Sequence, residues 1–231
     1  GYKINFTLNK NTKCIFLANS KSFLRSKADR KYNKITFGFD DLSKFKNKYP
    51  SVPVIQRINH VFSAGDINYF NIFSKISKLT DHYVYISDWT KEMFQNNSKW
   101  VNKPSIVIQN QADINLFNMN NKKEWNKGDR LKIVTHHFST DESKGFDKYK
   151  ELDEIIFNNP ELNIEFTYIG NLPKNIKFKS SNIISQLHGQ KLSDELKKNH
   201  LYITAAKDEA GGMHWIEAIQ CGLPLLYYKK N

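Results

Sequence analysis

Short runs of β-branched and aromatic residues alternate along this chain with longer amphipathic stretches. In the first half, the short runs predict strands over residues 14–18, 53–58, 83–87 and 105–110. The remaining stretches predict helices over 66–79 and 88–96, the second opened by Ser87 or Asp88 as its N-cap, and basic, solvated helices over 20–34 and 44–48. This alternation is typical of βαβ units and a mostly parallel sheet.

The pattern begins again after a segment without apolar periodicity. Residues 119–129 are rich in Asn and Lys and form the best linker candidate. Beyond it, strands are predicted over 132–138, 164–170, 182–185, 201–206 and 223–228, the last of them buried, and helices over 142–157, 191–198 and 213–221. We therefore predict an α/β fold of two Rossmann-like domains, one over 1–125 and one over 126–231.

Composition narrows the classes of function. The 231 residues are 39% hydrophobic and 13% aromatic, which is a globular composition. A net charge of +12 is compatible with nucleic-acid binding, but the lysines are scattered and form no basic block, so we do not expect nucleic acid as a partner. Attraction to phosphates, on a small nucleotide or on a membrane surface, stays open.

Two features favour a cytoplasmic location. No run approaches the ~20 apolar residues that span a bilayer, and the N-terminus lacks the apolar region of a signal peptide. Only two cysteines occur, Cys14 and Cys221, and their separation favours a reducing compartment over a disulfide framework. We expect a cytoplasmic protein, with contact to the inner membrane surface as an alternative.

The loop that leads into the helix beginning at Met213 is the strongest candidate binding site. In open α/β sheets, ligands bind where strands end and helices begin, and this loop contains Gly211 and Gly212. Paired glycines allow close backbone approach, and the N–H groups at a helix start favour a phosphate or carboxylate. Glu209 and Glu217 flank this position, and acceptor-only carboxylates suit the vicinal hydroxyls of a sugar or ribose. A nucleotide sugar has hydroxyls at both ends and phosphates between them.

These residues belong to a recognisable signature. The stretch EAGGMHWIEAIQCGLPLLY, residues 209–227, resembles the donor site of retaining GT-B glycosyltransferases of the glycogen-synthase-like superfamily, or glycosyl transferases group 1. Residues 136–153 resemble the first loop and helix of the family's donor domain, with Lys144 and Gly145 as its Lys-Gly pair. Residues 84–94 and 107–117 resemble the end of its acceptor-side domain. The resemblance covers most of 53–228 and is most specific after residue 200.

The resemblance implies a fold, a reaction and a set of roles. The fold is GT-B, with an N-terminal acceptor-side domain and a C-terminal donor domain facing a cleft. The reaction is metal-independent transfer of a hexose, with no cofactor, from a nucleoside-diphosphate sugar to a saccharide or lipid-linked acceptor, as in polysaccharide biosynthesis. Glu209 is expected to contact the transferred sugar, Lys144 to neutralise the leaving diphosphate and Glu217 to bind the ribose. The rest of the implied donor-binding set is Gly211, Gly212, Met213, Ser139, Gly145 and His137.

Three departures from the family pattern affect this expectation. The family usually has an Arg five residues before the donor-domain Lys, where this chain has Ser139, so one diphosphate clamp is missing. His136 and His137 lie at the same strand end and offer a partial substitute. The glycine-rich loop that normally follows the first acceptor-domain strand is absent, and the chain ends just after a donor-domain strand. We therefore expect both domains to be incomplete.

Weaker candidates and alternatives remain beside this hypothesis. Arg57 and His60 follow from the predicted strand over 53–58 as acceptor-side candidates, with packing roles equally open. A zinc site is not expected, because His188, His200 and His214 share no short spacing and Cys221 is expected to face the core at a helix end. One alternative is a non-catalytic remnant of the fold that binds a nucleotide, a polyanion or a partner chain. A glycoside hydrolase, which also uses two carboxylates, is the other.

Overall fold

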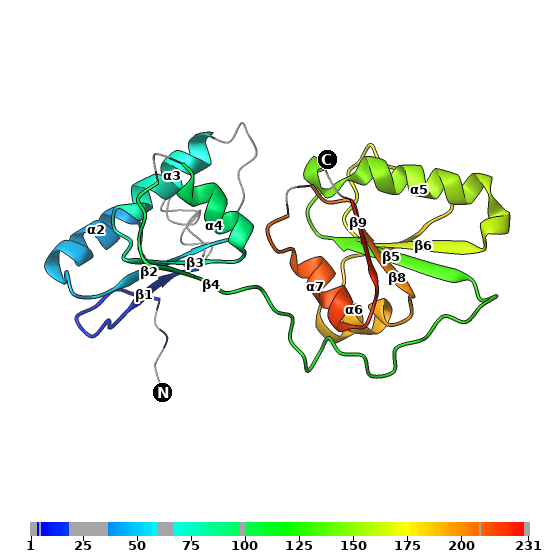
Figure 1. Cartoon of the computed structure of the whole chain (residues 1–231), viewed down its shortest axis with the longest axis horizontal. Helices are drawn as coiled ribbons and strands as arrows, with labels where there is room; N and C mark the ends of the chain where they lie inside the picture. The colour runs from blue at the N-terminus through cyan, green and yellow to red at the C-terminus, as the bar shows by residue number, and fades with distance from the viewer. Residues whose placement is uncertain are drawn as a thin grey trace. The chain divides into compact units, whose positions relative to one another are not determined.

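The computed structural model describes residues 4, 6–18, 37–59, 67–97, 100–207 and 209–228. The chain divides into two compact units, Gly1–Gln109 and Asn110–Asn231. Each unit is built on its own parallel sheet with helices packed against it (Figure 1). The predicted α/β architecture is therefore confirmed.

The first unit contains a four-stranded sheet in the order β1-β2-β3-β4, and all of its pairs are parallel. Its strands are β1 (Ile15–Leu17), β2 (Val54–Ile58), β3 (His82–Tyr85) and β4 (Ser105–Val107). Its described helices are α2 (Phe39–Lys48), α3 (Ile67–Ser77) and α4 (Asp88–Gln95). Ser87 is the N-cap of α4, as predicted, and its hydroxyl accepts the Thr90 N–H at 3.2 Å. The basic helix predicted over 20–34 lies outside the described residues.

The second unit contains a five-stranded sheet in the order β7-β6-β5-β8-β9, again parallel throughout. Its strands are β5 (Leu131–His137), β6 (Ile164–Gly170), β7 (Asn182–Ile184), β8 (Leu201–Thr204) and β9 (Leu225–Tyr227). Its helices are α5 (Phe146–Asn158), α6 (Gly189–Leu196), α7 (Met213–Gln220) and the short 3₁₀ turns η2 (Glu142–Lys144) and η3 (Pro160–Leu162). The chain builds outward from β5 to β7 and then returns to add β8 on the other side of β5, which makes β5/β8 the topological switch point.

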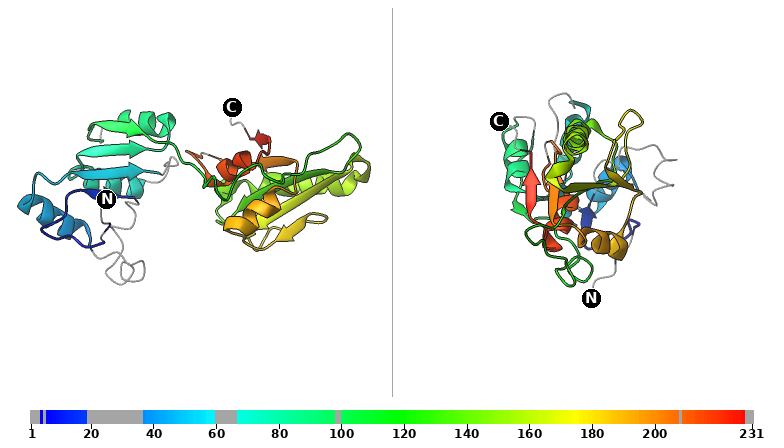
Figure 2. Two further views of the ribbon diagram at one scale, coloured as in Figure 1. Left: turned by 90° about the horizontal axis from the view of Figure 1, so that it is seen from below. Right: turned by 90° about the vertical axis from the view of Figure 1, so that its right-hand side faces the viewer.

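Two hydrophobic cores cover the two faces of this second sheet. On one face, α5 packs Phe146 and Tyr149 against Ile133 of β5. On the other face, α6 and α7 pack against Val134, the next residue of β5. Figure 2 shows α5 and α6 on opposite sides of the strands. Because neighbouring strand residues point to opposite faces, β5 presents its alternate side chains to different helices, and its last residues do the same at the candidate site.

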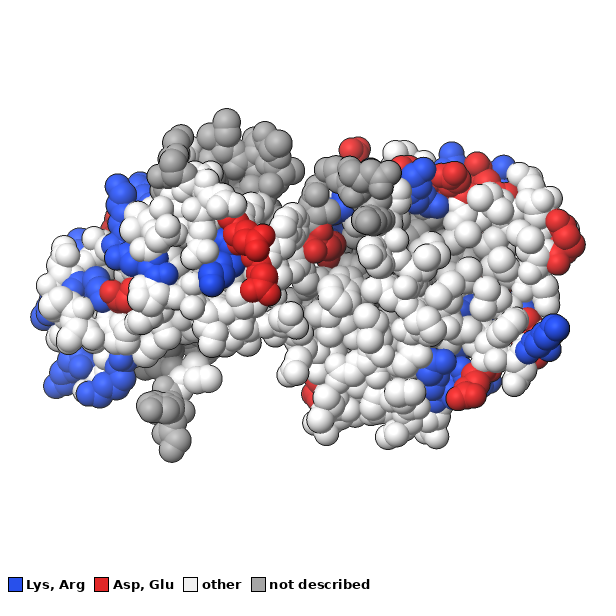
Figure 3. Space-filling view, viewed as in Figure 1, with Lys and Arg blue, Asp and Glu red and all other residues white. Residues whose placement is uncertain are grey.

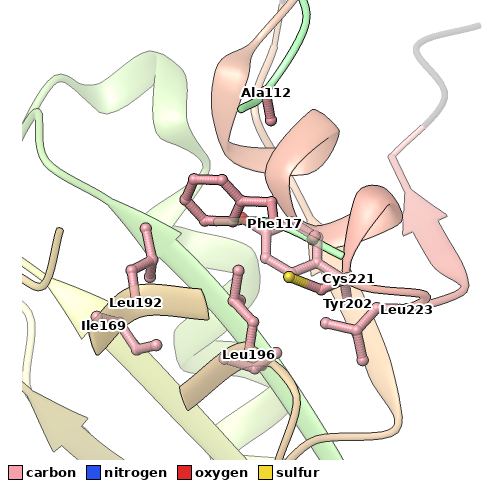
Figure 4. Close-up of a cluster of buried hydrophobic side chains, with 10 residues drawn as sticks. Ala112, Phe117, Ile169, Leu192, Leu196, Tyr202, Cys221 and Leu223 are labelled. Atoms are coloured by element: carbon pink, nitrogen blue, oxygen red, sulfur yellow. The ribbon is translucent and has the colours of Figure 1, made fainter. Parts of the chain in front are cut away.

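The segment that connects the two sheets belongs to the second unit. Ala112 and Phe117 are 6% and 5% exposed and lie in the core beneath α6 and α7, where Figure 4 shows Phe117 close to Cys221. Ser193 donates its hydroxyl to the Leu116 carbonyl at 2.6 Å. The division at residues 109 and 110 thus precedes the predicted boundary at 125, and residues 119–129 are not a linker between the units. Isolated apolar residues such as Phe117 give no periodic signal, which is why the sequence placed the boundary too late.

Two other elements differ from their predictions. The helix predicted over 142–157 is divided at Gly145, which separates η2 from α5. The last strand, predicted to be buried, is an edge strand in which Leu226 and Tyr227 are 53% and 62% exposed. An apolar run alone does not distinguish a central strand from an edge strand.

Charge and hydropathy give two further observations. On the face shown in Figure 3, basic side chains are separated by acidic and uncharged ones. Within the residues that the structure describes, no helix has the length and apolar character needed to cross a membrane.

Replacing Phe117 by Ala tests whether the connecting segment is part of the second unit. We expect the free energy of unfolding of this unit to fall by about 3 kcal/mol, because the change leaves a cavity in its core. Hydrogen exchange at the amides of β5 and β6 in increasing urea reports on this unit alone. Ile114→Ala is the matched control, since Ile114 is in the same segment and 71% exposed. Equal behaviour of the two variants would restore the linker interpretation.

Candidate functional site

The loops that follow β5 and β8 meet at the carboxyl edge of the second sheet. The two strands are paired in parallel, so both loops leave the sheet side by side. A backbone hydrogen bond of 2.7 Å, from the Lys207 N–H to the Ser143 carbonyl, ties one loop to the other. The residues predicted from the two separate sequence motifs therefore come together at one edge.

Lys144 and Glu209 form an ion pair across these loops. The Lys144 Nζ lies 2.6 Å from the Glu209 Oε1, and the two side chains are 19% and 25% exposed. The turn that carries Lys144 closes at Gly145, whose φ of 75° is left-handed. A Cβ at Gly145 would also overlap the carbonyl of Ala205, so only glycine allows this approach to the end of β8. The predicted cation and the predicted carboxylate are thus in direct contact and partly open to solvent.

Helix α7 begins at the same edge. Its N-cap, Gly212, has an ordinary φ of −67° and makes no side-chain cap. The N–H groups of the first turn, from Met213 onward, therefore point toward this edge and favour an anion there. A Cβ at Gly212 would overlap the Glu209 carboxylate, so the position needs the absence of a side chain and no special φ. The Gly211 carbonyl accepts a 2.7 Å hydrogen bond from the Asn110 side chain, which fixes the loop from the other side.

Glu217 lies in the second turn of α7 and contacts the end of β5. Its Oε2 is 3.1 Å from the Nε2 of His136, whose side chain is 2% exposed, while that of Glu217 is 18% exposed. His136 is on the same face of β5 as Val134, the face that α7 covers. The second carboxylate of the motif is therefore anchored by a buried imidazole and still reaches solvent.

Comparison with solved structures identifies the fold. No protein-family profile and no curated protein matches the chain. Among solved structures it is similar to WaaG, a glycosyltransferase involved in lipopolysaccharide biosynthesis, with a TM-score of 0.62, 14% identity and coverage of 88% of this chain and 65% of WaaG. For sucrose-phosphate synthase from Thermosynechococcus elongatus, the TM-score is 0.61 at 12% identity, with coverage of 93% of this chain and 55% of the synthase. For HepE from Anabaena, solved with UDP and glucose, the TM-score is 0.60 at 13% identity, with coverage of 92% of this chain and 58% of HepE.

The chain has the GT-B fold. At 12–14% identity these structures establish the architecture and nothing finer, and the chain spans 55–65% of their length. The GT-B assignment confirms the fold implied by the motif around Glu209 and Glu217. The second unit holds the contacts described above. It corresponds in sequence to the predicted C-terminal donor domain.

His137 differs from its prediction as a donor-binding cation. It is 3% exposed, and its Nε2 lies 2.7 Å from the hydroxyl of Tyr149, on the α5 face of the GT-B sheet. Burial, followed by the charge of Lys144, lowers the pKa of His137 to about 3. The imidazole is therefore neutral near pH 7 and is not a substitute for the missing Arg. The sequence placed His137 at the right strand end, where its ring packs against Tyr149 of α5 and lies 4.6 Å from the ring of His214 in α7.

His214 is a site residue that the sequence did not predict. Its Nδ1 lies 3.5 Å from the Glu209 Oε2, and its Nε2 lies 3.1 Å from the hydroxyl of Thr204. Burial, followed by the charges of His137 and His136, lowers its pKa well below the ordinary value. One sequence signal existed, namely that His214 directly follows Met213 in the first turn of α7.

The remaining predicted residues are less informative. Ser139 is exposed and its hydroxyl accepts the Asp141 N–H at 3.1 Å, so it caps its own loop. Arg57 is half-buried in β2 of the first unit, and His60 lies outside the described residues. Within the described part of the chain, no three His, Cys, Asp or Glu side chains are arranged to hold a metal ion.

Proposed function

We propose that this chain forms the nucleotide-sugar-binding part of a retaining glycosyltransferase that moves a sugar from a nucleoside-diphosphate sugar to a saccharide or lipid-linked acceptor. The observation that carries this proposal is the arrangement of Lys144, Glu209 and Glu217 around the start of α7. It combines a cation, a helix N-terminus and two partly exposed carboxylates at the switch point of the sheet. These groups match the phosphates and the two sets of hydroxyls of such a donor.

Each group has a role in the proposed reaction. When the bond between the sugar and the diphosphate breaks, negative charge develops on the diphosphate oxygen. Lys144 and the first N–H groups of α7, presented by Gly211, Gly212 and Met213, stabilise this charge without a metal ion. Glu209 accepts hydrogen bonds from the hydroxyls of the transferred sugar. Glu217 accepts them from the ribose.

The proposal extends to acceptor and location. Of the neighbours named above, WaaG is involved in lipopolysaccharide biosynthesis, one is a sucrose-phosphate synthase, and HepE was solved with UDP and glucose. These descriptions support a saccharide acceptor and a role in polysaccharide biosynthesis. The first unit, with Arg57, is the proposed acceptor side. Cys14 and Cys221 are both free, which supports a cytoplasmic location, with contact to the inner membrane surface as part of the proposal.

Calorimetry with UDP, GDP and ADP tests the donor site. We expect one of these nucleotides to bind, and Glu217→Ala to weaken that binding about tenfold or more, because a carboxylate acceptor for the ribose is lost. Glu161→Ala is the matched control: Glu161 is exposed in η3, at the amino edge of the sheet. The proposal fails if none of the three nucleotides binds, or if Glu217→Ala binds as Glu161→Ala does. Binding without any transfer or hydrolysis of a nucleotide sugar would favour the non-catalytic alternative.

A further inference from the structure

Strand β8 presents two hydroxyl groups, from Tyr202 and Thr204, to two histidines that contact the two carboxylates of the site. Tyr202 and Thr204 are 0% and 6% exposed and, two residues apart, lie on the same face of the strand. The contacts form two separate series, each of three side chains. The Glu217 relay consists of Tyr202, His136 and Glu217, and the Glu209 relay consists of Thr204, His214 and Glu209.

We propose that Tyr202 and Thr204 are positioning residues, which hold the two carboxylates for the nucleotide sugar through histidines of opposite tautomer. This inference rests on the proposed function for the identity of the ligand. The relays themselves rest only on the contacts within the second unit.

In the Glu217 relay, the Tyr202 hydroxyl lies nearer to the His136 Nδ1, at 3.2 Å, than to the His136 carbonyl, at 3.4 Å. A carboxylate only accepts hydrogen bonds, so the Nε2 of His136, 3.1 Å from Glu217, carries the proton and donates. In the tautomer with its one N–H on Nε2, the Nδ1 accepts, and the Tyr202 hydroxyl lies 3.2 Å from it. Complete burial raises the pKa of Tyr202 well above its ordinary value, so this hydroxyl keeps its proton and donates. The same hydroxyl oxygen accepts the His136 backbone N–H at 3.1 Å, which fixes its position on β5.

In the Glu209 relay, the assignment runs in the opposite sense. Burial keeps His214 neutral, and its Nδ1 lies 3.5 Å from the Glu209 Oε2, which can only accept, so the single N–H of the ring is on Nδ1. The Nε2 then accepts the Thr204 hydroxyl proton at 3.1 Å, while the Thr204 oxygen accepts the Ala206 N–H at 3.3 Å. The other oxygen of Glu209 contacts Lys144 at 2.6 Å. The Glu209 carboxylate is thus held from two directions.

The two relays end on different parts of the proposed donor. The Glu217 relay acts on the ribose-binding carboxylate, and the Glu209 relay acts on the carboxylate for the transferred sugar. Loss of one hydroxyl of β8 is therefore expected to affect one end of the donor only. A residue that serves packing alone would weaken both ends together or neither.

The histidine tautomers are measured first, without any ligand. Long-range ¹H–¹⁵N spectra of the whole chain distinguish the two neutral tautomers through their ring nitrogen shifts. We expect Nε2–H for His136 and Nδ1–H for His214. Tyr202→Phe should change the ring nitrogen shifts of His136 and leave those of His214, and Thr204→Val should do the reverse. A shared tautomer for the two histidines, or spectra that neither variant changes, would overturn the inference.

Donor binding is measured next, with UDP and UDP-glucose as probes. We expect Tyr202→Phe to weaken the binding of UDP about threefold to tenfold, since one hydrogen bond in the relay is lost. The binding of 2′,3′-dideoxy-UDP, which lacks the ribose hydroxyls, should not change. Thr204→Val should leave the affinity for UDP unchanged and lower the affinity for UDP-glucose. Thr204→Ser, which keeps the hydroxyl, should bind UDP-glucose as the wild type does. Tyr168→Phe is the matched control, because Tyr168 is equally buried and its hydroxyl bonds to the Asn171 carbonyl at 2.9 Å, within the other core.

The two measurements separate the inference from the proposed function. If the tautomers are as expected but neither UDP nor UDP-glucose binds, the proposed donor is wrong and the relays stand as an orienting device for another ligand. If UDP and UDP-glucose bind, but Tyr202→Phe binds UDP and Thr204→Val binds UDP-glucose as tightly as Tyr168→Phe does, the positioning role is wrong and the proposed function stands.

Discussion

Replacing Lys144 by Met is expected to lower the turnover of a nucleotide sugar about 10²-fold to 10³-fold, the usual cost of removing one fixed charge-stabilising donor from an active site. Lys144 contacts Glu209 at 2.6 Å, and this chain has Ser139 where the motif that it resembles has an Arg. Without a second cation at that position, Lys144 carries a larger share of the diphosphate charge. The Met side chain keeps the length of the stem and removes only the charge.

The measurement is release of UDP from UDP-glucose, with kcat and KM determined separately. A loss in kcat with little change in KM indicates that Lys144 acts on the charge that develops during bond breaking. Lys148→Met is the matched control, because Lys148 lies four residues after Lys144, in the first turn of α5, and is 45% exposed in a surface pair with Glu151. Wild-type kcat in Lys144→Met would contradict the role assigned to Lys144.

The ion pair also bears on the binding of the proposed donor. Lys144 donates a hydrogen bond to Glu209, so a diphosphate would share this cation with the carboxylate. Gly212 limits where the carboxylate can go, since even a Cβ at that position would overlap it. The same close packing holds the carboxylate near the place proposed for the transferred sugar.

Short-range patterns in the sequence were sufficient for the fold and for the motif residues. The strands β5 and β6 were predicted to within one residue at each end, because their apolar runs are bounded by turn residues. Glu209, Gly212 and Glu217 lie within one loop and one helix, so they were predicted together from this segment and its resemblance to the family motif.

Contacts between distant residues were not predictable from the same patterns. His136 meets Glu217 across 81 positions, and Asn110 meets Gly211 across 101. The first contact depends on strand order and on the face of β5 that His136 takes, and the second on the path of the segment before β5. Neither is visible in local spacing. The contact of His137 with His214, whose ring centroids are 4.6 Å apart, is likewise invisible in local spacing.

The stability of the second unit is expected to fall steeply as the pH is lowered, and His137 is a main cause. Its pKa is about 3 in the folded state, against an ordinary 6.5. Between these values the unfolded chain binds a proton at this residue and the folded chain does not, so protons favour unfolding. The contribution is fully present above pH 6.5 and is lost at about 1.4 kcal/mol per pH unit below it, about 5 kcal/mol in all by pH 3. His214, whose pKa is also lowered by burial, acts in the same direction.

Urea unfolding of the wild type and of His137→Gln at pH 7 and pH 5 measures this effect. The amide of Gln keeps a partner for the Tyr149 hydroxyl and does not titrate, so the variant should lose about 2 kcal/mol less than the wild type over this interval. His188→Gln removes an exposed imidazole from the same unit and should keep the wild-type pH dependence. Identical pH dependence in His137→Gln and the wild type would mean that His137 protonates in the folded state. It would then be available again as a cation for a diphosphate, whereas the expected result leaves that charge to Lys144 and the start of α7.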